Sequence, residues 1–132
     1  MSILILVVDD EPDVEMLFRQ QFRREAREGK FALQFALSAQ EALALLAGAD
    51  GKELILILSD INMPGMSGLE LLPKIKQLHP DVPVVMITAY GDADTRSKAL
   101  ALGAQDLLTK PVDFIALKAR IAAHLAQKGL AA

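Results

Sequence analysis

Leu54-Ile55-Leu56-Ile57-Leu58-Ser59-Asp60-Ile61-Asn62-Met63-Pro64 is the stretch that decides the fold of this chain. Its apolar residues run without interruption and then end in a carboxylate, which is typical of a parallel strand covered on both faces. Two distant stretches end in charge in the same way: Val7-Val8-Asp9-Asp10-Glu11 and Leu108-Thr109-Lys110-Pro111. If all three are parallel strands, their C-terminal ends share one edge of the sheet, where open α/β sheets bind ligands.

Strand-like and helix-like patterns alternate five times along the chain. Short aliphatic or β-branched runs predict strands over residues 3–8, 31–37, 54–59, 83–88 and 106–109. Apolar residues at helical spacing predict helices over residues 14–29, 39–47, 69–79, 92–102 and 114–125. Parallel strands need crossover helices between them, so this (βα)5 alternation predicts an α/β fold. We expect a doubly wound, five-stranded parallel sheet with helices on both sides.

The composition excludes several classes of protein. A chain of 132 residues is long enough for one domain with a substantial core. We assign that domain to residues 1–127 and a short tail to 128–132. The absence of cysteine excludes disulfides and thiolate metal sites and fits a cytoplasmic location. The net charge of −3 argues against direct nucleic-acid binding, and apolar runs such as residues 3–8 are too short to span a membrane.

Three carboxylates at the predicted sheet edge, those of Asp9, Asp10 and Asp60, indicate a site for a divalent cation. Such a cluster is costly to assemble without a cation. Mg²⁺ prefers oxygen ligands and combines one or two carboxylates with water and a substrate phosphate. The backbone carbonyl of Asn62, in the loop just after Asp60, is a further candidate ligand. We therefore predict Mg²⁺ as the cofactor and these four residues as its ligands.

The same edge carries residues suited to phosphoryl transfer. A carboxylate is a competent nucleophile toward phosphorus, which makes Asp60 a candidate phosphoacceptor. Lys110, at the end of the fifth predicted strand, supplies a compact cation for the charge that spreads over the phosphoryl oxygens. Thr88, at the end of the fourth predicted strand, offers a hydroxyl donor. We predict catalytic roles for these three residues.

Each of these features also has an ordinary structural explanation. Asp10 or Asp13 could cap the first helix, and Met63-Pro64-Gly65 could be only a turn. The two histidines, His79 and His124, are expected at helix ends or on helix surfaces, without a functional role. The interpretation as a phosphoryl-transfer site depends on these features occurring together, because all of the candidates fall at C-terminal strand ends of one topology.

The loop Asp60-Ile61-Asn62-Met63-Pro64-Gly65-Met66-Ser67-Gly68 resembles the phosphoacceptor loop of receiver domains in bacterial two-component response regulators. The resemblance covers nearly the whole chain. It implies a flavodoxin-like (CheY-like) fold with strand order 2-1-3-4-5. It also implies that Asp60 is the phosphoacceptor, that Asp10 binds Mg²⁺ directly, and that Asp9 acts largely through water.

The resemblance extends to the ends of the last two predicted strands. Thr88 matches the family's switch hydroxyl, and the small Ala89 that follows leaves room for the phosphoryl group. Lys110 matches the phosphate-binding lysine. The family usually has a cis peptide bond before the proline that is Pro111 here, and a tight turn can select that isomer at a cost of about 0.5–1 kcal/mol.

One position departs from the family's pattern. The fifth-strand position that usually carries Tyr or Phe is Leu107 here. In the family that aromatic ring swings inward as the threonine hydroxyl moves, and it carries the signal to the surface formed by the last two helices and the strand between them. Leu107 is smaller and has no hydroxyl, so we expect phosphorylation to reorganise residues 88–95 more than this strand. Tyr90 could gate the site or could be a passive aromatic.

The leading interpretation is a signalling switch and not an enzyme. It would accept a phosphoryl group from a histidine kinase or a histidine phosphotransfer protein and then act on a downstream partner or a covalent output domain, with homodimerisation on phosphorylation as an option. A Mg²⁺-dependent phosphohydrolase is the alternative, but Ile61 and Asn62 supply no second carboxylate beside Asp60. A further alternative is a binding module that never turns over phosphate, as in degenerate receivers, but the intact acidic pair, Asp60, Thr88 and Lys110 argue against it. Nucleotide binding is the least favoured alternative, because the chain has no glycine-rich fingerprint.

Overall fold

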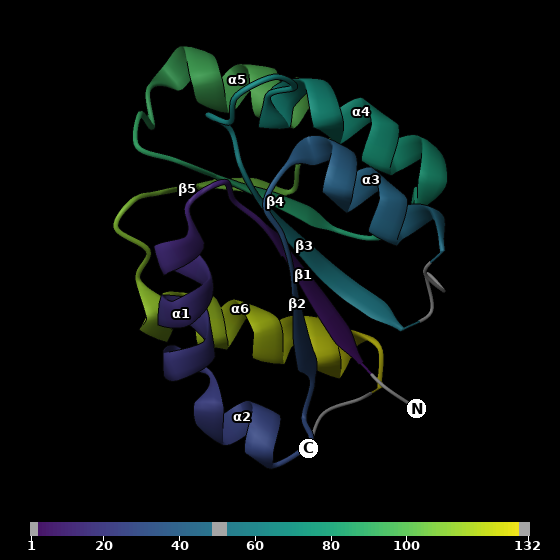
Figure 1. The fold of residues 1–132 in the computed structure, drawn as a ribbon, viewed down its shortest axis with the longest axis vertical. Coiled ribbons are helices and arrows are strands. Elements are labelled where there is room, and N and C mark those ends of the chain that lie inside the picture. Colours follow the sequence, from purple (N-terminus) through teal and green to yellow (C-terminus); the bar gives the residue numbers. More distant parts are fainter. Residues whose placement is uncertain (1–2, 49–52, 130–132) are drawn as a thin grey trace.

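The computed structural model describes residues 3–48 and 53–129 of the chain. Its centre is a five-stranded parallel sheet in the order β2-β1-β3-β4-β5 (Figure 1). The strands are β1 (Leu4–Val8), β2 (Ala32–Ala36), β3 (Leu54–Asp60), β4 (Val84–Thr88) and β5 (Asp106–Thr109). The predicted fold class and strand order are therefore confirmed.

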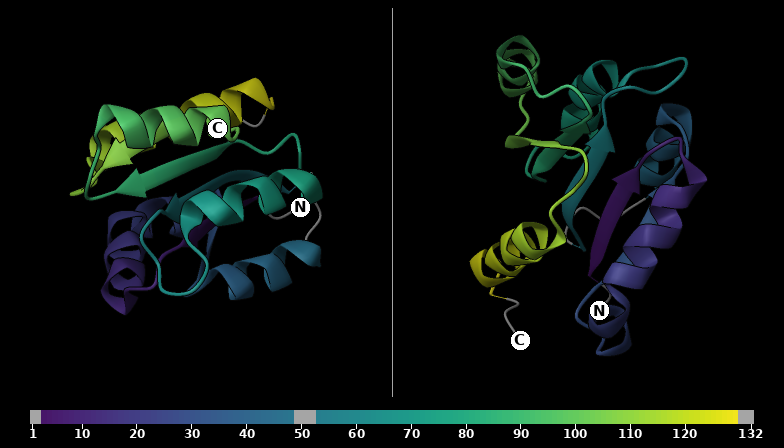
Figure 2. Two further views of the ribbon diagram at one scale, coloured as in Figure 1. Left: turned by 90° about the horizontal axis from the view of Figure 1, so that it is seen from above. Right: turned by 90° about the vertical axis from the view of Figure 1, so that its left-hand side faces the viewer.

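Six helices form two layers within the described ranges; five of them lie between consecutive strands, and α6 follows β5. They are α1 (Pro12–Gln21), α2 (Arg23–Arg27), α3 (Ala39–Ala47), α4 (Gly68–Leu78), α5 (Ala93–Ala101) and α6 (Phe114–Gln127). α1, α2 and α6 cover one face of the sheet, and α3, α4 and α5 cover the other (Figures 1 and 2). No helix within the described parts of the chain is both long and apolar enough to cross a membrane.

The sheet is hydrophobic on both faces because helices cover both. Every residue of β3, the central strand, is buried. The side chains that alternate along the strands form two separate cores, one under each helical layer. Burial of this kind contributes about 25 cal/mol per Å² of apolar surface removed from water, so it helps to hold β3 in place. Asp60 is the last residue of this buried strand.

The single helix predicted over residues 14–29 is wrong, because the chain forms two helices that meet at Phe22. The backbone leaves helical geometry at this residue (φ −107°, ψ 19°). Phe22 is buried, and its ring packs against Phe31 at 5.7 Å and Phe114 at 5.9 Å between ring centroids. We attribute the break to the burial of Phe22 between these two rings.

His124 lies in the last turn of α6, as expected of a residue at a helix end, but it is buried and does not lie on the helix surface. His124 is only 7% exposed, because it lies three residues after Ile121 and seven after Leu117 on the buried side of α6. His79 ends α4, as expected, and its Nε2 lies 2.8 Å from the carbonyl oxygen of Leu46. Of the predicted tail over 128–132, residues 130–132 lie outside the described part of the chain.

Candidate functional site

The register of the sheet brings four predicted site residues to one edge. Val8 pairs with Ser59, so that Asp9 follows β1 beside the end of β3. Asp60 pairs with Ile87 on β4, one residue before Thr88. Thr88 in turn pairs with Thr109 on β5, the residue before Lys110. Because the strands pair in parallel without large offsets, the predicted site residues lie together although they are distant in sequence.

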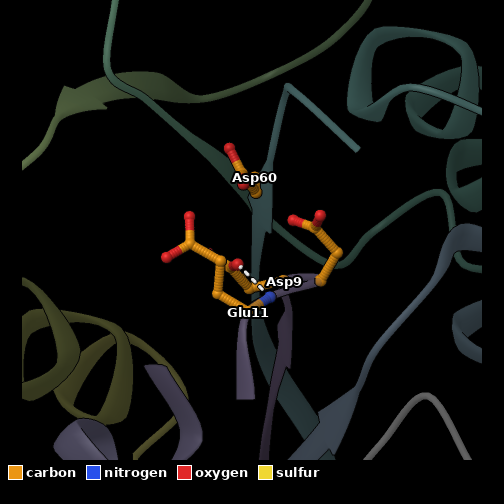
Figure 3. Close-up of side chains that lie close together, drawn as sticks. Asp9, Glu11 and Asp60 are labelled. Atoms are coloured by element: carbon orange, nitrogen blue, oxygen red, sulfur yellow. Dashed lines mark hydrogen bonds between the residues drawn. The ribbon is translucent and has the colours of Figure 1, made fainter. Parts of the chain in front are cut away.

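Four carboxylates gather at this edge. Each of Asp9, Asp10, Glu11 and Asp60 has a ligand oxygen within 4.8 Å of those of the others. Figure 3 shows the side chains of Asp9, Glu11 and Asp60 converging from the ends of β1 and β3. Asp9 and Asp60 are buried, at 6% and 3% exposure, whereas Asp10 is half-buried and Glu11 is exposed. The acidic cluster is thus buried at Asp9 and Asp60 and open to solvent at Glu11.

Lys110 is the cation that faces this cluster among the described residues. Its Nζ lies 3.2 Å from Asp60 Oδ2, 3.3 Å from Asp9 Oδ2 and 3.8 Å from Glu11 Oε1. The peptide bond between Lys110 and Pro111 is cis, as the resemblance implied. One ammonium therefore joins the ends of β1, β3 and β5.

The acidic cluster carries more negative charge than the Lys110 ammonium can balance. Burial of the Asp60 carboxyl, followed by the negative charge of Asp9, raises the pKa of Asp60 above its ordinary value of 3.8, although Lys110 and the Asn62 N–H oppose this. Burial alone would lower the pKa of Lys110, but the charges of Asp9 and Asp60 outweigh it and raise that pKa. Lys110 is therefore held as an ammonium, and the carboxylates retain unbalanced repulsion.

The second oxygen of Asp60 is held by the loop that follows. The backbone N–H of Asn62 donates to Asp60 Oδ1 at 3.2 Å, and the Asn62 side-chain Nδ2 donates to Thr88 Oγ1 at 3.5 Å. Asn62 thus lies between Asp60 and Thr88. The role of its backbone carbonyl as a metal ligand stays a prediction.

Thr88 is buried and lies at the predicted position, but its hydroxyl oxygen faces the loops. It accepts hydrogen bonds from Asn62 and from the backbone N–H of Tyr90, the latter at 3.1 Å. The Tyr90 side chain is 71% exposed. In this conformation the Tyr90 side chain is largely exposed, and its backbone N–H binds Thr88.

Two glycines shape the loop after Asp60. Gly65 has φ +78°, a conformation that favours glycine. At Gly68 an added Cβ would lie 2.2 Å from the carbonyl oxygen of Asp60, so the start of α4 can approach β3 only without a side chain. Ser67 and Glu70 then form a capping box that fixes the beginning of α4. The Met63-Pro64-Gly65 turn therefore belongs to the loop that holds Asp60 in position.

The capping explanation for the acidic pair is not what the structure contains. α1 begins after Glu11, which is its N-cap and makes no side-chain capping bond, and Pro12 occupies the first turn. Asp9 Oδ1 accepts from the Glu11 N–H at 3.0 Å, whereas Asp10 and Asp13 do not cap the helix. Sequence reasoning missed Glu11 as a member of the cluster, although its place directly after the acidic pair was a usable signal.

The residues around Leu107 form a separate polar network. Leu107 is buried, and the preceding Asp106 pairs with Arg96 of α5 at 2.9 Å and with Arg120 of α6. Burial opposes the ionisation of Asp106, but the Leu107 N–H, Arg120 and Arg96 outweigh it and lower the pKa of this carboxyl below 3.8. Asp106 therefore ties β5 to the helices on both sides of it.

The cluster fits a hard divalent cation by its chemistry. All four acidic groups offer oxygen, their ligand atoms lie close enough to share one ion, and two of them are buried. Oxygen ligands of this kind suit Mg²⁺. Lys110 alone does not balance four carboxylates, so a cation would relieve the remaining repulsion.

Comparison with known proteins identifies the class. The model of the response regulator receiver domain matches residues 5–122, and the chain therefore belongs to this family of two-component signalling domains. The chain is 43% identical over 120 residues to the response regulator protein PilR of Pseudomonas aeruginosa, covering 91% of this chain and 25% of that protein. It is 40% identical over 124 residues to the DNA-binding transcriptional regulator NtrC of Salmonella typhimurium, covering 92% and 25%.

A solved structure agrees with this assignment. The CheY-like receiver domain protein of Methanospirillum hungatei JF-1 matches with a TM-score of 0.84 and 29% identity, over 98% of each chain. The chain spans about a quarter of the length of the two curated relatives named above. What it shares with them is the receiver domain.

Proposed function

We propose that this receiver domain accepts a phosphoryl group on Asp60 from a phosphohistidine donor and thereby switches its conformation. An oxygen of the Asp60 carboxylate forms a bond to phosphorus while the bond between phosphorus and the donor imidazole nitrogen breaks. The imidazole leaves with the electron pair, and the product is an aspartyl phosphate. The chain gains the phosphoryl group once and later loses it. It therefore acts as a switch and not as an enzyme that turns over a substrate.

The observation that carries this proposal is the position of Lys110 against Asp60. Its ammonium lies 3.2 Å from Asp60 Oδ2 and 3.3 Å from Asp9 Oδ2, at an edge where β1, β3 and β5 end. Phosphoryl transfer needs mainly positioning and neutralisation of oxygen charge, which this ammonium supplies. Thr88 supplies a hydroxyl next to the same loop, and rotation about its χ1 would direct that hydroxyl toward the phosphoryl oxygens.

Asp9, Asp10 and Asp60, with the carbonyl of Asn62, would hold Mg²⁺ at the same edge. When bound, the ion supplies positive charge to the oxygens of the transferring group. The carboxylates fit this role because they are gathered within 4.8 Å together with Glu11. Asp10, which is half-buried and forms no ion pair with Lys110, is the residue most available as a direct ligand.

A protein donor would find an apolar surface beside the site. Met16 and Leu17 of α1 and Ile115 of α6 are exposed to 72%, 43% and 85%. Leu17 also lines a hollow that reaches Lys110 and Pro111. We propose that exposed apolar side chains of α1 and α6, with Leu17 at the hollow next to Lys110, contact the protein donor. This donor would be a histidine kinase or a histidine phosphotransfer protein, whose phosphohistidine would then face Asp60.

The remaining partner assignments stay predictions. The output is a downstream protein or a covalent output domain, because the chain corresponds to only about a quarter of its regulatory relatives. Homodimerisation on phosphorylation and a cytoplasmic location also stay predictions. We propose no membrane-binding role for this domain.

The test is intact-mass measurement after incubation with acetyl phosphate and Mg²⁺. The unchanged chain should gain one phosphoryl mass, Asp60→Asn should not, and Asp81→Asn, at an exposed aspartate, should still gain it. Omission of Mg²⁺ should prevent the gain. Stoichiometric labelling of the Asp60→Asn chain would refute the proposal.

A further inference from the structure

A polar cavity lies at the opposite end of the strands from the acidic site. It has a volume of about 320 Å³ and lies between the last turns of α4 and α6 and the residues that precede β4 and β5. Small-molecule sites have volumes from about 300 Å³ upward. The lining residues are polar or charged, with the exception of one proline: Lys76, Asp81, Pro83, Gln105, His124, Gln127 and Lys128. The proposed phosphotransfer uses none of them.

His124 is the buried polar residue of this cavity. It is only 7% exposed, and no residue in the described ranges 3–48 and 53–129 forms a hydrogen bond with its ring. Neither ring nitrogen is completely sealed from solvent. The hydrogen-bonding capacity of the ring is therefore open to the cavity that His124 lines. Buried polar side chains normally have a partner, so this imidazole lacks one that the cavity could hold.

Lys76 presents a fixed ammonium to the same cavity. Its Nζ donates to the carbonyl oxygen of Val82 at 2.9 Å, and its aliphatic stem packs along Gly103, where an added Cβ would lie 3.5 Å from Lys76 Cε. Within the described parts of the chain Lys76 forms no ion pair. Burial lowers the pKa of Lys76, although the charge of Asp81 opposes this. The ammonium therefore lacks a counter-charge that offsets its burial.

The charges that act on His124 from its own helix are also positive. Burial of the ring lowers the pKa of His124 below 6.5, and the charges of Arg120 and Lys128 act in the same direction. Arg120 is paired with Asp106 of β5. Lys128 is exposed and, among the residues that the structure describes, has no ion-pair partner. The ring and the two lysines thus face one cavity without a shared anion.

Helix geometry explains only part of this arrangement. Lys76 lies in the last turn of α4 and Lys128 directly follows α6, where basic residues offset the partial negative charge of a helix end. This does not explain a buried imidazole without a partner in the same cavity. The carboxylate among the lining residues is that of Asp81, which is exposed and therefore screened by water. An anion would supply both an acceptor for His124 and the counter-charge.

We propose that this cavity binds a small divalent oxyanion of the sulfate or phosphate class. Its oxygens would accept hydrogen bonds from the His124 ring and from the ammonium groups of Lys76 and Lys128. The side-chain amides of Gln105 and Gln127 would supply further donors. An anion favours the protonated imidazole, so binding tightens as the pH falls. The site is independent of the proposed phosphotransfer, because it shares no residue with the acidic edge.

The first test is NMR titration of the full chain, labelled at its two histidines, with sulfate and, in parallel, with acetate at equal ionic strength and without Mg²⁺. Sulfate should shift the ring resonances of His124 and leave those of His79, whose Nε2 lies 2.8 Å from the Leu46 carbonyl oxygen. Sulfate should bind about tenfold more tightly than acetate, because its second charge pairs with the second ammonium. Equal binding of the two anions, or no saturable shift at His124, would overturn the proposal.

Two lysine variants provide a matched comparison. Lys128→Met removes an ammonium from the cavity, and Lys98→Met removes an exposed one from the last turn of α5, outside the cavity. Lys128→Met should weaken sulfate binding about tenfold, and Lys98→Met should not. Melting temperatures would show that both variants fold. Equal losses in the two variants would assign the effect to general attraction by surface lysines and refute the site.

His124→Gln tests the role of the imidazole, because glutamine keeps a donor but cannot gain a proton. In the unchanged chain sulfate affinity should rise as the pH is lowered from about 7.5 to about 6, a range that includes the ordinary pKa of imidazole. Sulfate keeps its charge over this range. In His124→Gln the affinity should be lower and independent of pH. A pH dependence that persists in this variant would show that His124 does not hold the anion.

Discussion

Replacing Lys110 by methionine should destabilise the chain, and Mg²⁺ should compensate for much of the loss. The substitution removes the ammonium that lies 3.2 Å from Asp60 and 3.3 Å from Asp9, both of which are buried. Breaking a buried ion pair costs about 3–5 kcal/mol. The Lys110 side chain is 26% exposed, so water can reach the carboxylates after the change. We therefore expect a loss of about 2 kcal/mol, after a discount for solvent screening.

Thermal and urea unfolding would measure this loss with and without about 10 mM Mg²⁺, because a ligand that binds only the folded state stabilises it by mass action. A loss of about 2 kcal/mol corresponds to about 6–10 °C in Tm for a chain of this size. Lys74→Met, at an exposed lysine of α4, is the matched control and should be nearly neutral. The reasoning is refuted if Lys110→Met is no more destabilising than Lys74→Met, or if Mg²⁺ stabilises both variants equally.

Three further changes probe other parts of the chain. Asp10→Ala should raise Tm without Mg²⁺ and abolish the Mg²⁺-dependent shift, because Asp10 adds repulsion without pairing to Lys110; a lower Tm in differential scanning fluorimetry would contradict this. Burial and two nearby cations lower the pKa of His124 below 6.5, so stability should fall as pH drops below about 6.5, and His124→Gln should reduce that dependence in urea unfolding. Beryllofluoride should shift amide resonances of residues 88–95 more than those of β5. Unchanged resonances over residues 88–95 would contradict this prediction.

The sign of the His124 effect follows from which state binds the proton. In the unfolded chain the imidazole takes a proton near its ordinary pKa of 6.5. In the folded chain burial keeps it neutral to lower pH, with the charges of Arg120 and Lys128 acting in the same direction. Between the two pKa values the unfolded state binds more protons, so its share grows as the pH falls.

Much of the fold was predictable because the buried strands carry their own pattern. The five predicted strands differ from the observed ones by at most one residue at either end, since continuous apolar runs bounded by charge have few alternatives. β3 extends one residue further than predicted, to Asp60, because that residue still pairs with Ile87 of β4. The backbone ladder, and not the chemistry of the side chain, decides where the strand ends.

The site residues were predictable for the same reason, but their contacts were not. The C-terminal ends of parallel strands lie at one edge of the sheet, which is sufficient to gather Asp9, Asp60 and Lys110. The participation of Glu11 depends on how α1 starts after Pro12, and no periodic pattern encodes that turn. The break at Phe22 likewise depends on Phe31 and Phe114, which are distant in sequence.

The departure at Leu107 is accompanied by a different connection between the same elements. Asp106 pairs with Arg96 of α5 and Arg120 of α6, and Arg96 also contacts the carbonyl oxygen of Leu107 at 3.5 Å. α5 begins at Ala93, only five residues after Thr88. A movement of the loop after Thr88 would therefore move α5 and strain its contact with β5 directly. This arrangement would transmit a loop rearrangement to the helix without an aromatic ring that swings inward, which is why we expect residues 88–95 to respond first.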